Sequence, residues 1–311
     1  MTANSKGSIW RDLRFWQFAG QAIAVVLIVL LLAFLGSNLN RNLQQLGIRL
    51  GFGFLNSQAG FTIGETPIPY QPSDSYSRAI LVGLVNSLRV IVSGLGLATI
   101  VGLAAGIARL SNNWLVRQLA LVYVEGLRNL PLLIQLFFWY FAIFLSLPLS
   151  DQAISWFDGL LTFSKNGVGL PGGLQLSSEF SALLLGLSLY TGTFIAEIVR
   201  SGIQSVPRGQ WEAAKSLGLK FAPTMRLVIL PQALRAIVPP LGNQYLNLAK
   251  NSSLAIAVGY PDLYAVSSTT FNQTGRAVEV MILICVTYLT ISLIISLLLN
   301  LYNRSVQLIE R

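Results

Sequence analysis

The sequence predicts an all-α, polytopic membrane protein with about six transmembrane helices. Hydrophobic residues make up 53% of the 311 residues, and charged residues only 11%. Soluble domains carry about 25% charged residues, so this composition is typical of an integral membrane protein. The apolar residues also come in long blocks, which favours spanning helices over two soluble domains. We therefore expect one membrane domain.

The first apolar block, residues 17–36, is charge-free and 20 residues long. Such a helix can cross about 30 Å of hydrocarbon. Lys6, Arg11 and Arg14 precede it, which also fits a signal peptide, but the block is long for one, so we predict an uncleaved span. Residues 38–77 are polar and contain several Pro and Gly. Within them, residues 66–70 cannot form a regular helix because two prolines break it.

Five further blocks predict the remaining spans, at residues 79–108, 119–147, 180–199, 227–259 and 278–301. Between the third and fourth spans, residues 148–179 are rich in Gly, Ser and Pro and predict a loop. Residues 261–276 are typical of a short amphipathic external element. We divide the chain into residues 1–76, with the N-terminal tail, the first span and an external segment, and residues 77–311, the transmembrane domain with a large loop at 200–226.

The positions of Lys and Arg predict the orientation, because cytoplasmic loops carry an excess of these residues. An even number of spans places both termini on one side. Arg89, Arg128 and Lys250 fall within spans and are not counted. The predicted external set has 5 members: Arg41, Arg49, Arg78, Lys165 and Arg276. The predicted cytoplasmic set has 13 members: Lys6, Arg11, Arg14, Arg109, Arg117, Arg200, Arg208, Lys215, Lys220, Arg226, Arg235, Arg304 and Arg311. Both termini and the 200–226 loop are therefore expected in the cytoplasm.

The residue content argues against an enzyme. There is no histidine and one cysteine, Cys285, so the usual general base, a thiolate metal site and a disulfide within the chain are all excluded. No G-x-x-x-x-G-K-[ST] phosphate loop occurs, so we expect no ATP site and no cofactor in this chain. The net charge of +9 follows from the topological bias, and no soluble basic face suggests nucleic-acid binding.

The most specific motif lies in residues 212–231, EAAKSLGLKFAPTMRLVILP. It has the E-A-A pattern of Glu212, Ala213 and Ala214, then Gly218 six positions after the Glu, and a later L-P; Val228 stands where Ile is usual. This stretch resembles the cytoplasmic EAA loop by which permease subunits of ATP-binding-cassette importers engage their ATPase. The alternative is an ordinary polar loop between membrane helices.

Flanking segments extend the resemblance over residues 77–303. TGTFIAEIVRSGIQSVPRGQWEAA and LPQALRAIVPPLGNQYLNLAKNSSLA resemble the polar amino acid branch, of histidine and glutamine permease type. The extra first span and residues 51–90 resemble the general L-amino acid permease subgroup. Where compact members read R-G-T-P, this chain has RNLP at 128–131.

That resemblance implies a type I importer permease fold in a bacterial inner membrane. It implies an ATP-driven import system for acidic and neutral amino acids. The implied partners are a separate ABC ATPase dimer that binds ATP-Mg, a second permease subunit that is a paralogue, an external solute-binding protein, membrane lipid and the amino acid substrate. The rival interpretation is an ion-coupled secondary amino acid carrier or a channel subunit, which needs an intramembrane carboxylate; Glu197 is the one candidate.

The physical features of the 200–226 loop fit a coupling helix. Pro207 favours a helix start and Gly218 can take the left-handed conformation that ends one, so about ten residues make a rod of roughly 15 Å. Trp211, Ala214 and Gly218 recur on one side, and Glu212 can pair with Lys215. The predicted ATPase-coupling residues are Glu212, Ala213, Ala214, Gly218, Arg208 and Trp211.

Polar side chains within spans are costly in hydrocarbon and normally face a bundle interior or an aqueous path. They can supply the donors and acceptors that a zwitterionic amino acid needs, or merely join helices. The predicted substrate-path residues are Asn86, Glu197, Asn243, Asn247, Lys250, Asn251 and Ser252. Two further features concern helix packing. Pro239 and Pro240 predict a kink, either beside the substrate path or at a packing contact between helices. Gly102 and Gly106 predict a close helix approach, towards the partner subunit.

The basic-residue count leads to a labelling prediction. We expect Lys220 in the cytoplasm and Lys165 outside. Single-cysteine variants at these positions, made with Cys285 replaced by serine, are probed with an impermeant thiol reagent in intact cells. The Lys165 variant should react and the Lys220 variant should react only after permeabilisation. Equal access to both positions contradicts the six-span topology.

Overall fold

The computed structural model describes residues 13–45 and 50–306. Lys6, Arg11, Arg49 and Arg311 of the basic-residue count lie outside the described residues. The chain divides into two compact units, at residues 1–52 and 53–311. The first unit contains α1 (Leu13–Gln45), whose apolar stretch Trp16–Gln45 confirms the first predicted span.

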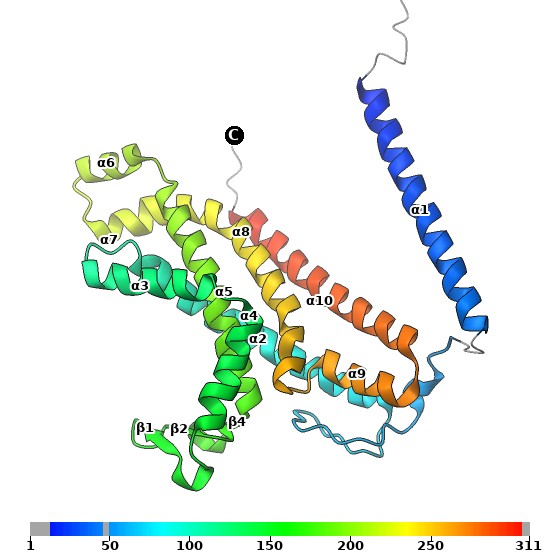
Figure 1. Cartoon of the computed structure of the whole chain (residues 1–311). Coiled ribbons are helices and arrows are strands. Elements are labelled where there is room, and N and C mark those ends of the chain that lie inside the picture. Colours follow the sequence, from blue (N-terminus) through cyan, green and yellow to red (C-terminus); the bar gives the residue numbers. More distant parts are fainter. Residues whose placement is uncertain (1–12, 46–49, 307–311) are drawn as a thin grey trace, which may run out of the picture. The chain divides into compact units, whose positions relative to one another are not determined.

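The second unit contains the remaining helices and a small sheet (Figure 1). Four of its helices are long and apolar enough to cross a membrane: α2, α5, α10 and the composite helix Phe221–Val258. The helices are α2 (Tyr76–Ala108), α3 (Trp114–Arg128), α4 (Leu132–Phe137), α5 (Ser178–Gln204), α6 (Arg208–Ser216), α7 (Phe221–Thr224), α8 (Leu230–Asn251), α9 (Leu263–Thr274) and α10 (Ala277–Val306). The π-helical segments are η3 (Phe138–Ile143) and η7 (Met225–Ile229); the 3₁₀ segments are η2 (Gly53–Asn56), η4 (Phe144–Ser146), η5 (Ser150–Gln152), η6 (Pro171–Gly173) and η8 (Ser252–Val258).

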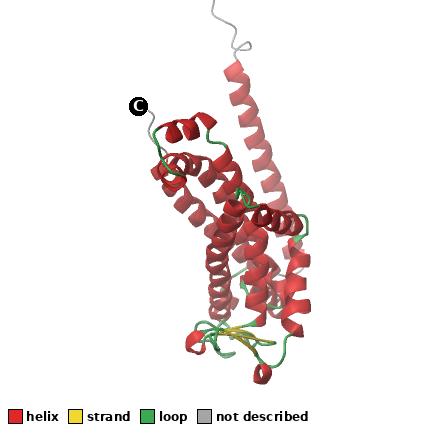
Figure 2. Cartoon of the chain, turned by 90° about the vertical axis from the view of Figure 1, so that its left-hand side faces the viewer, coloured by secondary structure: helices red, strands yellow, loops and turns green. Residues whose placement is uncertain are grey.

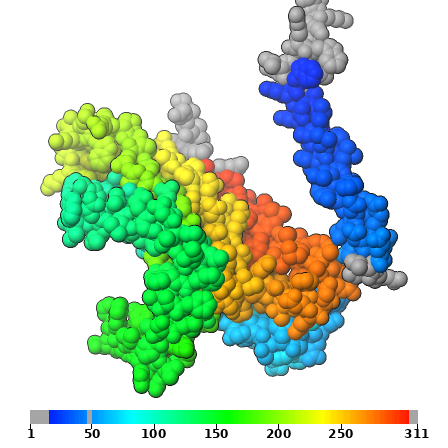
Figure 3. Space-filling model, in the orientation of Figure 1, coloured from blue at the N-terminus to red at the C-terminus, as the bar shows by residue number. Residues whose placement is uncertain are grey.

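The expected third span, residues 119–147, is sharply bent rather than one continuous helix. The helices Trp114–Arg128 and Leu132–Ser146 meet at 106°. Asn129 ends α3 and hydrogen-bonds back to the Glu125 carbonyl at 2.8 Å, and Pro131 has an extended ψ of 135° immediately before α4. Because proline lacks an N–H and disfavours a helical predecessor, the helix stops here and restarts in another direction. In the space-filling view α3 projects from the body of the unit (Figure 3).

The expected loop at 148–179 is also wrong in part, because it contains a four-stranded antiparallel sheet. The strands β1 (Ile154–Trp156), β2 (Leu161–Ser164), β3 (Gly167–Gly169) and β4 (Gln175–Leu176) pair in chain order. The register pairs Phe163 with both Ile154 and Val168. This meander and α6 lie at opposite ends of the second unit (Figures 1 and 2).

The centre of the second unit is the contact between α2 and α5, where glycines remove the side chains that would separate two helices. A Cβ at Gly102 would lie 2.5 Å from the Ile195 Cβ, and one at Gly106 would lie 2.8 Å from the Ala196 carbonyl oxygen. The expectation that these glycines face a partner subunit is therefore wrong: they pack within this chain. Ile195 belongs to a buried apolar cluster that continues through Ile229 and Leu248 of the fifth predicted span.

The structure also bears on the expectations for Pro239 and Pro240 and for residues 261–276. The helix α8 continues through Pro239 and Pro240, which leaves the Arg235 and Ala236 carbonyls without their usual helical donors. Residues 261–276 do form a short helix, α9, which starts at Asp262 and ends at Gly275 with a left-handed φ of 68°.

The 53–75 segment packs on the second unit rather than extending away from it. Phe54, Phe61 and Ile63 pack against a cluster that includes Tyr76 of α2 and Val266 of α9. The backbone of this segment closes on itself, since Ala59 N donates to the Asp74 carbonyl at 2.8 Å.

Side chains added at the α2–α5 contact should destabilise the protein. Gly102→Ala places a Cβ against Ile195, an overpacking that costs about 1–3 kcal/mol. Gly96→Ala is the matched control on the same helix, because no atom lies within 4 Å of its added Cβ. Thermal unfolding in detergent should show a lower midpoint for Gly102→Ala and an unchanged or slightly higher one for Gly96→Ala. Equal midpoints for the two variants would contradict the assigned contact.

Candidate functional site

The helix α6 is a short, sharply bounded rod. Pro207 precedes it with φ −56° and ψ 142°, and nine residues follow in helical conformation. Gly218 takes φ +73°, which L side chains rarely adopt, and its N–H donates to the Lys215 carbonyl at 2.9 Å. The expected helix with a left-handed glycine at its end is confirmed.

The two faces of α6 differ in what they contact. On the inner face, Ala214 is 2% exposed and the Trp211 ring stacks on Phe221, with 6.5 Å between centroids. On the outer face, Glu212 and Ala213 are exposed, and Leu217 just past the helix is 80% exposed.

The expected Glu212–Lys215 ion pair does not form among the described residues. Both side chains are exposed to water, where such a pair contributes little to stability. Both charges therefore remain on the outer face of α6.

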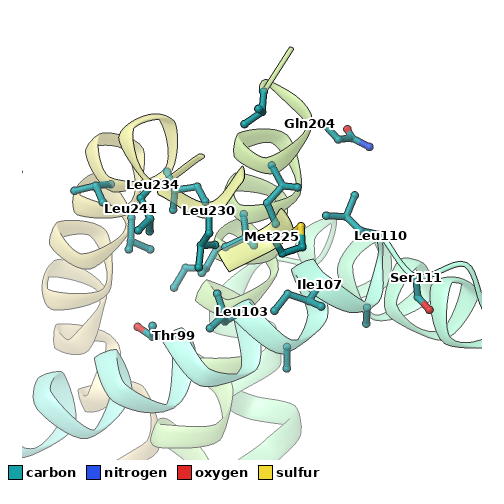
Figure 4. Close-up of a pocket in the computed structure, with 18 of the residues that line it drawn as sticks. Thr99, Leu103, Ile107, Leu110, Ser111, Gln204, Met225, Leu230, Leu234 and Leu241 are labelled. Atoms are coloured by element: carbon teal, nitrogen blue, oxygen red, sulfur yellow. The ribbon is translucent and has the colours of Figure 1, made fainter. Parts of the chain in front are cut away.

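A cavity of about 1300 Å³ lies beneath α6. Leu103 and Ile107 of α2, Met225 of η7 and Leu234 and Leu241 of α8 converge on it (Figure 4). Most of its lining is apolar. Arg208 and Trp211 of α6 also line it.

The polar residues that line this cavity include Thr99, Ser111, Asn112, Asn113, Gln204, Arg208, Tyr245 and Tyr302. The Thr99 and Tyr245 hydroxyls pair with each other at 2.8 Å, which leaves less capacity to bind a ligand.

Glu197 lies at the centre of a charge network near the end of α5 that leads to α6. One carboxylate oxygen accepts from Arg109 at 2.6 Å, and Arg200 bonds to the other. Arg109 also lies 3.8 Å from Glu125 of α3. The network joins α2, α3 and α5. The carboxylate that a proton- or ion-coupled carrier would need is thus already paired with two guanidinium groups.

The predicted path residues of α8 lie apart from this network. Asn243, Asn247 and Lys250 are exposed on this single chain and Asn251 is half-buried, whereas Ser252 is buried and donates to the Ala249 carbonyl at 2.8 Å. None of them lines the cavity beneath α6.

Asn86 is fully buried and has a joining role. Its amide donates to the carbonyls of Glu65 and Pro261, each at 2.9 Å, and so ties the 53–75 segment to the turn before α9. One turn further on, the Arg89 guanidinium forms an ion pair with the Glu65 carboxylate at 2.7 Å. The sequence analysis placed Arg89 within a span without a partner, and it did not single out Glu65. Glu65 could have been singled out from the sequence, because it is an acidic residue just before Thr66 and Pro67 in an otherwise uncharged stretch.

Another acidic residue, Asp262, caps the start of α9. It is fully buried and accepts from the Ala265 N–H at 2.8 Å and the Tyr288 hydroxyl at 3.2 Å. Burial raises the pKa of Asp262 to about 6, against which these hydrogen bonds act. Because the folded state holds this proton more tightly than the unfolded chain, ionisation of Asp262 lowers stability as pH rises from about 4 to above 6.

Comparison with known proteins identifies the family. Residues 86–308 match the family model "Binding-protein-dependent transport system inner membrane component". The chain is 41% identical to the putative amino-acid ABC transporter permease protein YhdX of Escherichia coli, over 96% of this chain and 95% of that protein. It is 38% identical to the general L-amino acid transport system permease protein AapQ of Rhizobium johnstonii, over 94% and 92% of the two chains.

A solved structure, "Crystal structure of an amino acid ABC transporter with histidines", matches with a TM-score of 0.59 and 29% identity. The match covers 74% of this chain and 95% of that one. With its spanning helices, its bounded α6 and a family match over most of its length, the chain belongs to the inner membrane components of binding-protein-dependent ABC transport systems.

Proposed function

We propose that the chain is the permease subunit of an ATP-driven amino acid importer and that α6 is its coupling helix. The observation that carries this proposal is α6 itself. Its inner face is packed on this chain, whereas its outer face offers Glu212, Ala213 and the exposed Leu217. A short rigid helix held at both ends can pass a partner's movement to the spans on either side.

The chain makes and breaks no bonds; a separate ATPase dimer binds ATP-Mg and supplies the energy. That ATPase docks on the outer face of α6 in the cytoplasm, where both termini of this chain also lie. The family description supports an external solute-binding protein and an inner-membrane location. We further infer that the second permease subunit is a paralogue.

The substrate class follows from the relatives. The Rhizobium relative is named for general L-amino acids and the Escherichia coli relative for amino acids. Acidic and neutral amino acids, the class that the sequence resemblance implies, are the proposed substrates. An ion-coupled carrier is disfavoured because Glu197 is engaged by Arg109 and Arg200.

The coupling role is tested by changing the outer face and the exit of α6. Glu212→Lys and Gly218→Asp should each abolish uptake while the protein remains in the membrane. The first reverses a charge on the docking face, and the second strains the left-handed backbone at Gly218. The measurements are labelled amino acid uptake, membrane level and co-purification of the ATPase.

Gly275→Asp is the matched control. Gly275 is also left-handed, at φ +68°, with no atom within 4 Å of an added Cβ, but it ends α9 rather than α6. Uptake should persist in this variant. Near-normal uptake in both α6 variants would exclude α6 as the coupling element.

The proposed path on α8 is tested separately. Asn243, Asn247 and Asn251 recur every four residues and share one side of the helix. Asn247→Leu keeps a similar volume and removes both donor and acceptor. A lost hydrogen bond to a charged ligand group weakens affinity about 10- to 150-fold, so uptake should fall while basal ATPase activity of the complex persists. Asn272→Leu on the exposed surface of α9 is the control. Unchanged uptake in Asn247→Leu would make Asn247 a packing residue.

A further inference from the structure

Arg89 is a cation inside a spanning helix that the proposed coupling mechanism does not use. It lies about 20 Å along α2 from Tyr76. Its side chain is 31% exposed, and its guanidinium carbon lies 5.1 Å from the centre of the Phe180 ring. A charge at this depth is costly and marks ligand pathways in membrane proteins. The position therefore calls for a partner anion.

The anion in this structure is the chain's own Glu65. Its carboxylate accepts from Arg89 through one oxygen at 2.7 Å and from the Ser177 hydroxyl through the other at 2.7 Å. Ser177 is also the N-cap of α5, where its hydroxyl accepts from the Phe180 N–H at 3.1 Å. The carboxylate thus lies where a guanidinium, a hydroxyl and the positive end of a long helix meet.

One further buried donor, on a ring that packs against Phe180, has no hydrogen-bond partner among the described residues. This donor is the hydroxyl of Tyr260. Its ring lies 5.8 Å from that of Phe180, against which Arg89 also packs. A buried hydroxyl without a partner costs stability unless a ligand satisfies it.

We propose that Arg89, Ser177 and Tyr260 form a carboxylate-binding site, that Glu65 is its tethered occupant, and that the α-carboxylate of the incoming amino acid displaces Glu65. This inference rests on the proposed function as an amino acid importer. It names the group of the substrate that the permease recognises first, at the end of the unit opposite α6. Displacement exchanges one carboxylate for another on the same donors, so no buried charge is left unpaired.

The location of this site relative to the cavity supports the proposal. Ile107, which lines the cavity beneath α6, is about five helical turns from Arg89 on the same face of α2, roughly 27 Å along the helix. The first cavity residue of α2, Thr99, is ten residues from Arg89, about 15 Å along the helix.

The family match supports the view that Glu65 is an added occupant. Residues 86–308 include Arg89, Ser177 and Tyr260 but not Glu65. The solved amino acid transporter covers only 74% of this chain although 95% of its own length is matched. The donors therefore belong to the shared domain, and the competing carboxylate comes from the segment before it.

The test measures binding of labelled glutamine to the purified permease–ATPase complex without the solute-binding protein. Glu65→Gln keeps the shape of the side chain and removes its charge, so it should bind glutamine about tenfold more tightly than wild type or better. Arg89→Gln should lose binding, and Glu65→Gln should not restore it in the double variant. Asp74→Asn is the matched control, because Asp74 belongs to the same segment but accepts from the Gln71 N–H rather than from Arg89; its affinity should stay within about twofold of wild type.

Glu65→Gln should raise the affinity for glutamine and Arg89→Gln should lower it, and this opposite change distinguishes the proposal from a structural role. If Glu65 and Arg89 only hold the fold together, both variants will weaken binding and lower thermal stability alike, and the proposal is overturned. It is also overturned if Glu65→Gln binds no more tightly than wild type. ATP-dependent uptake by the assembled wild-type importer is measured in parallel. Uptake without the predicted Glu65→Gln effect refutes the tethered occupant alone, whereas no uptake of any amino acid refutes the proposed function.

Discussion

The close approach of α2 and α5 depends on two glycines of α2, Gly102 and Gly106, which meet Ile195 and the Ala196 carbonyl directly. Without a hydrophobic driving force between helices in lipid, close packing of this kind is what holds spans together. The pair also connects the two ends of the second unit. At one end α5 runs through its charge network into α6, and at the other α2 carries the arginine that meets the 53–75 segment.

The helix α6 packs on the rest of the chain through few residues, and Ala214 is its one buried residue. Ala214 is buried against the chain and the Trp211 ring stacks on Phe221, while Trp211 and Arg208 also line the cavity. The π-helical segment η7 follows shortly after, and such segments often occur at functional sites. The Arg109–Glu197–Arg200 network joins α2 to the end of α5 that precedes α6.

Much of this architecture could be predicted from the sequence, because long apolar blocks must become spans and because Pro207 and Gly218 act locally on the backbone. The bend after α3 could not, since both of its arms are apolar and hydropathy carries no direction; only Pro131 indicated an interruption. The meander was missed because its strands are only two to four residues long. The Glu65–Arg89 pair joins residues 24 positions apart, so it depends on tertiary folding of an irregular segment.

The order of Glu65 and Arg89 along the chain has a consequence for biosynthesis. An arginine near the middle of a helix entering the bilayer costs about 2.5–3.5 kcal/mol at the insertion machinery. Because the ribosome makes the chain from its N-terminus, Glu65 leaves the ribosome before Arg89 does. The counter-charge is thus available when α2 is handed to the membrane, and a loop of 24 residues is short enough to close within a fraction of a millisecond. Synthesis order supplies Arg89 with a neutralising partner before any other helix of the second unit has been made.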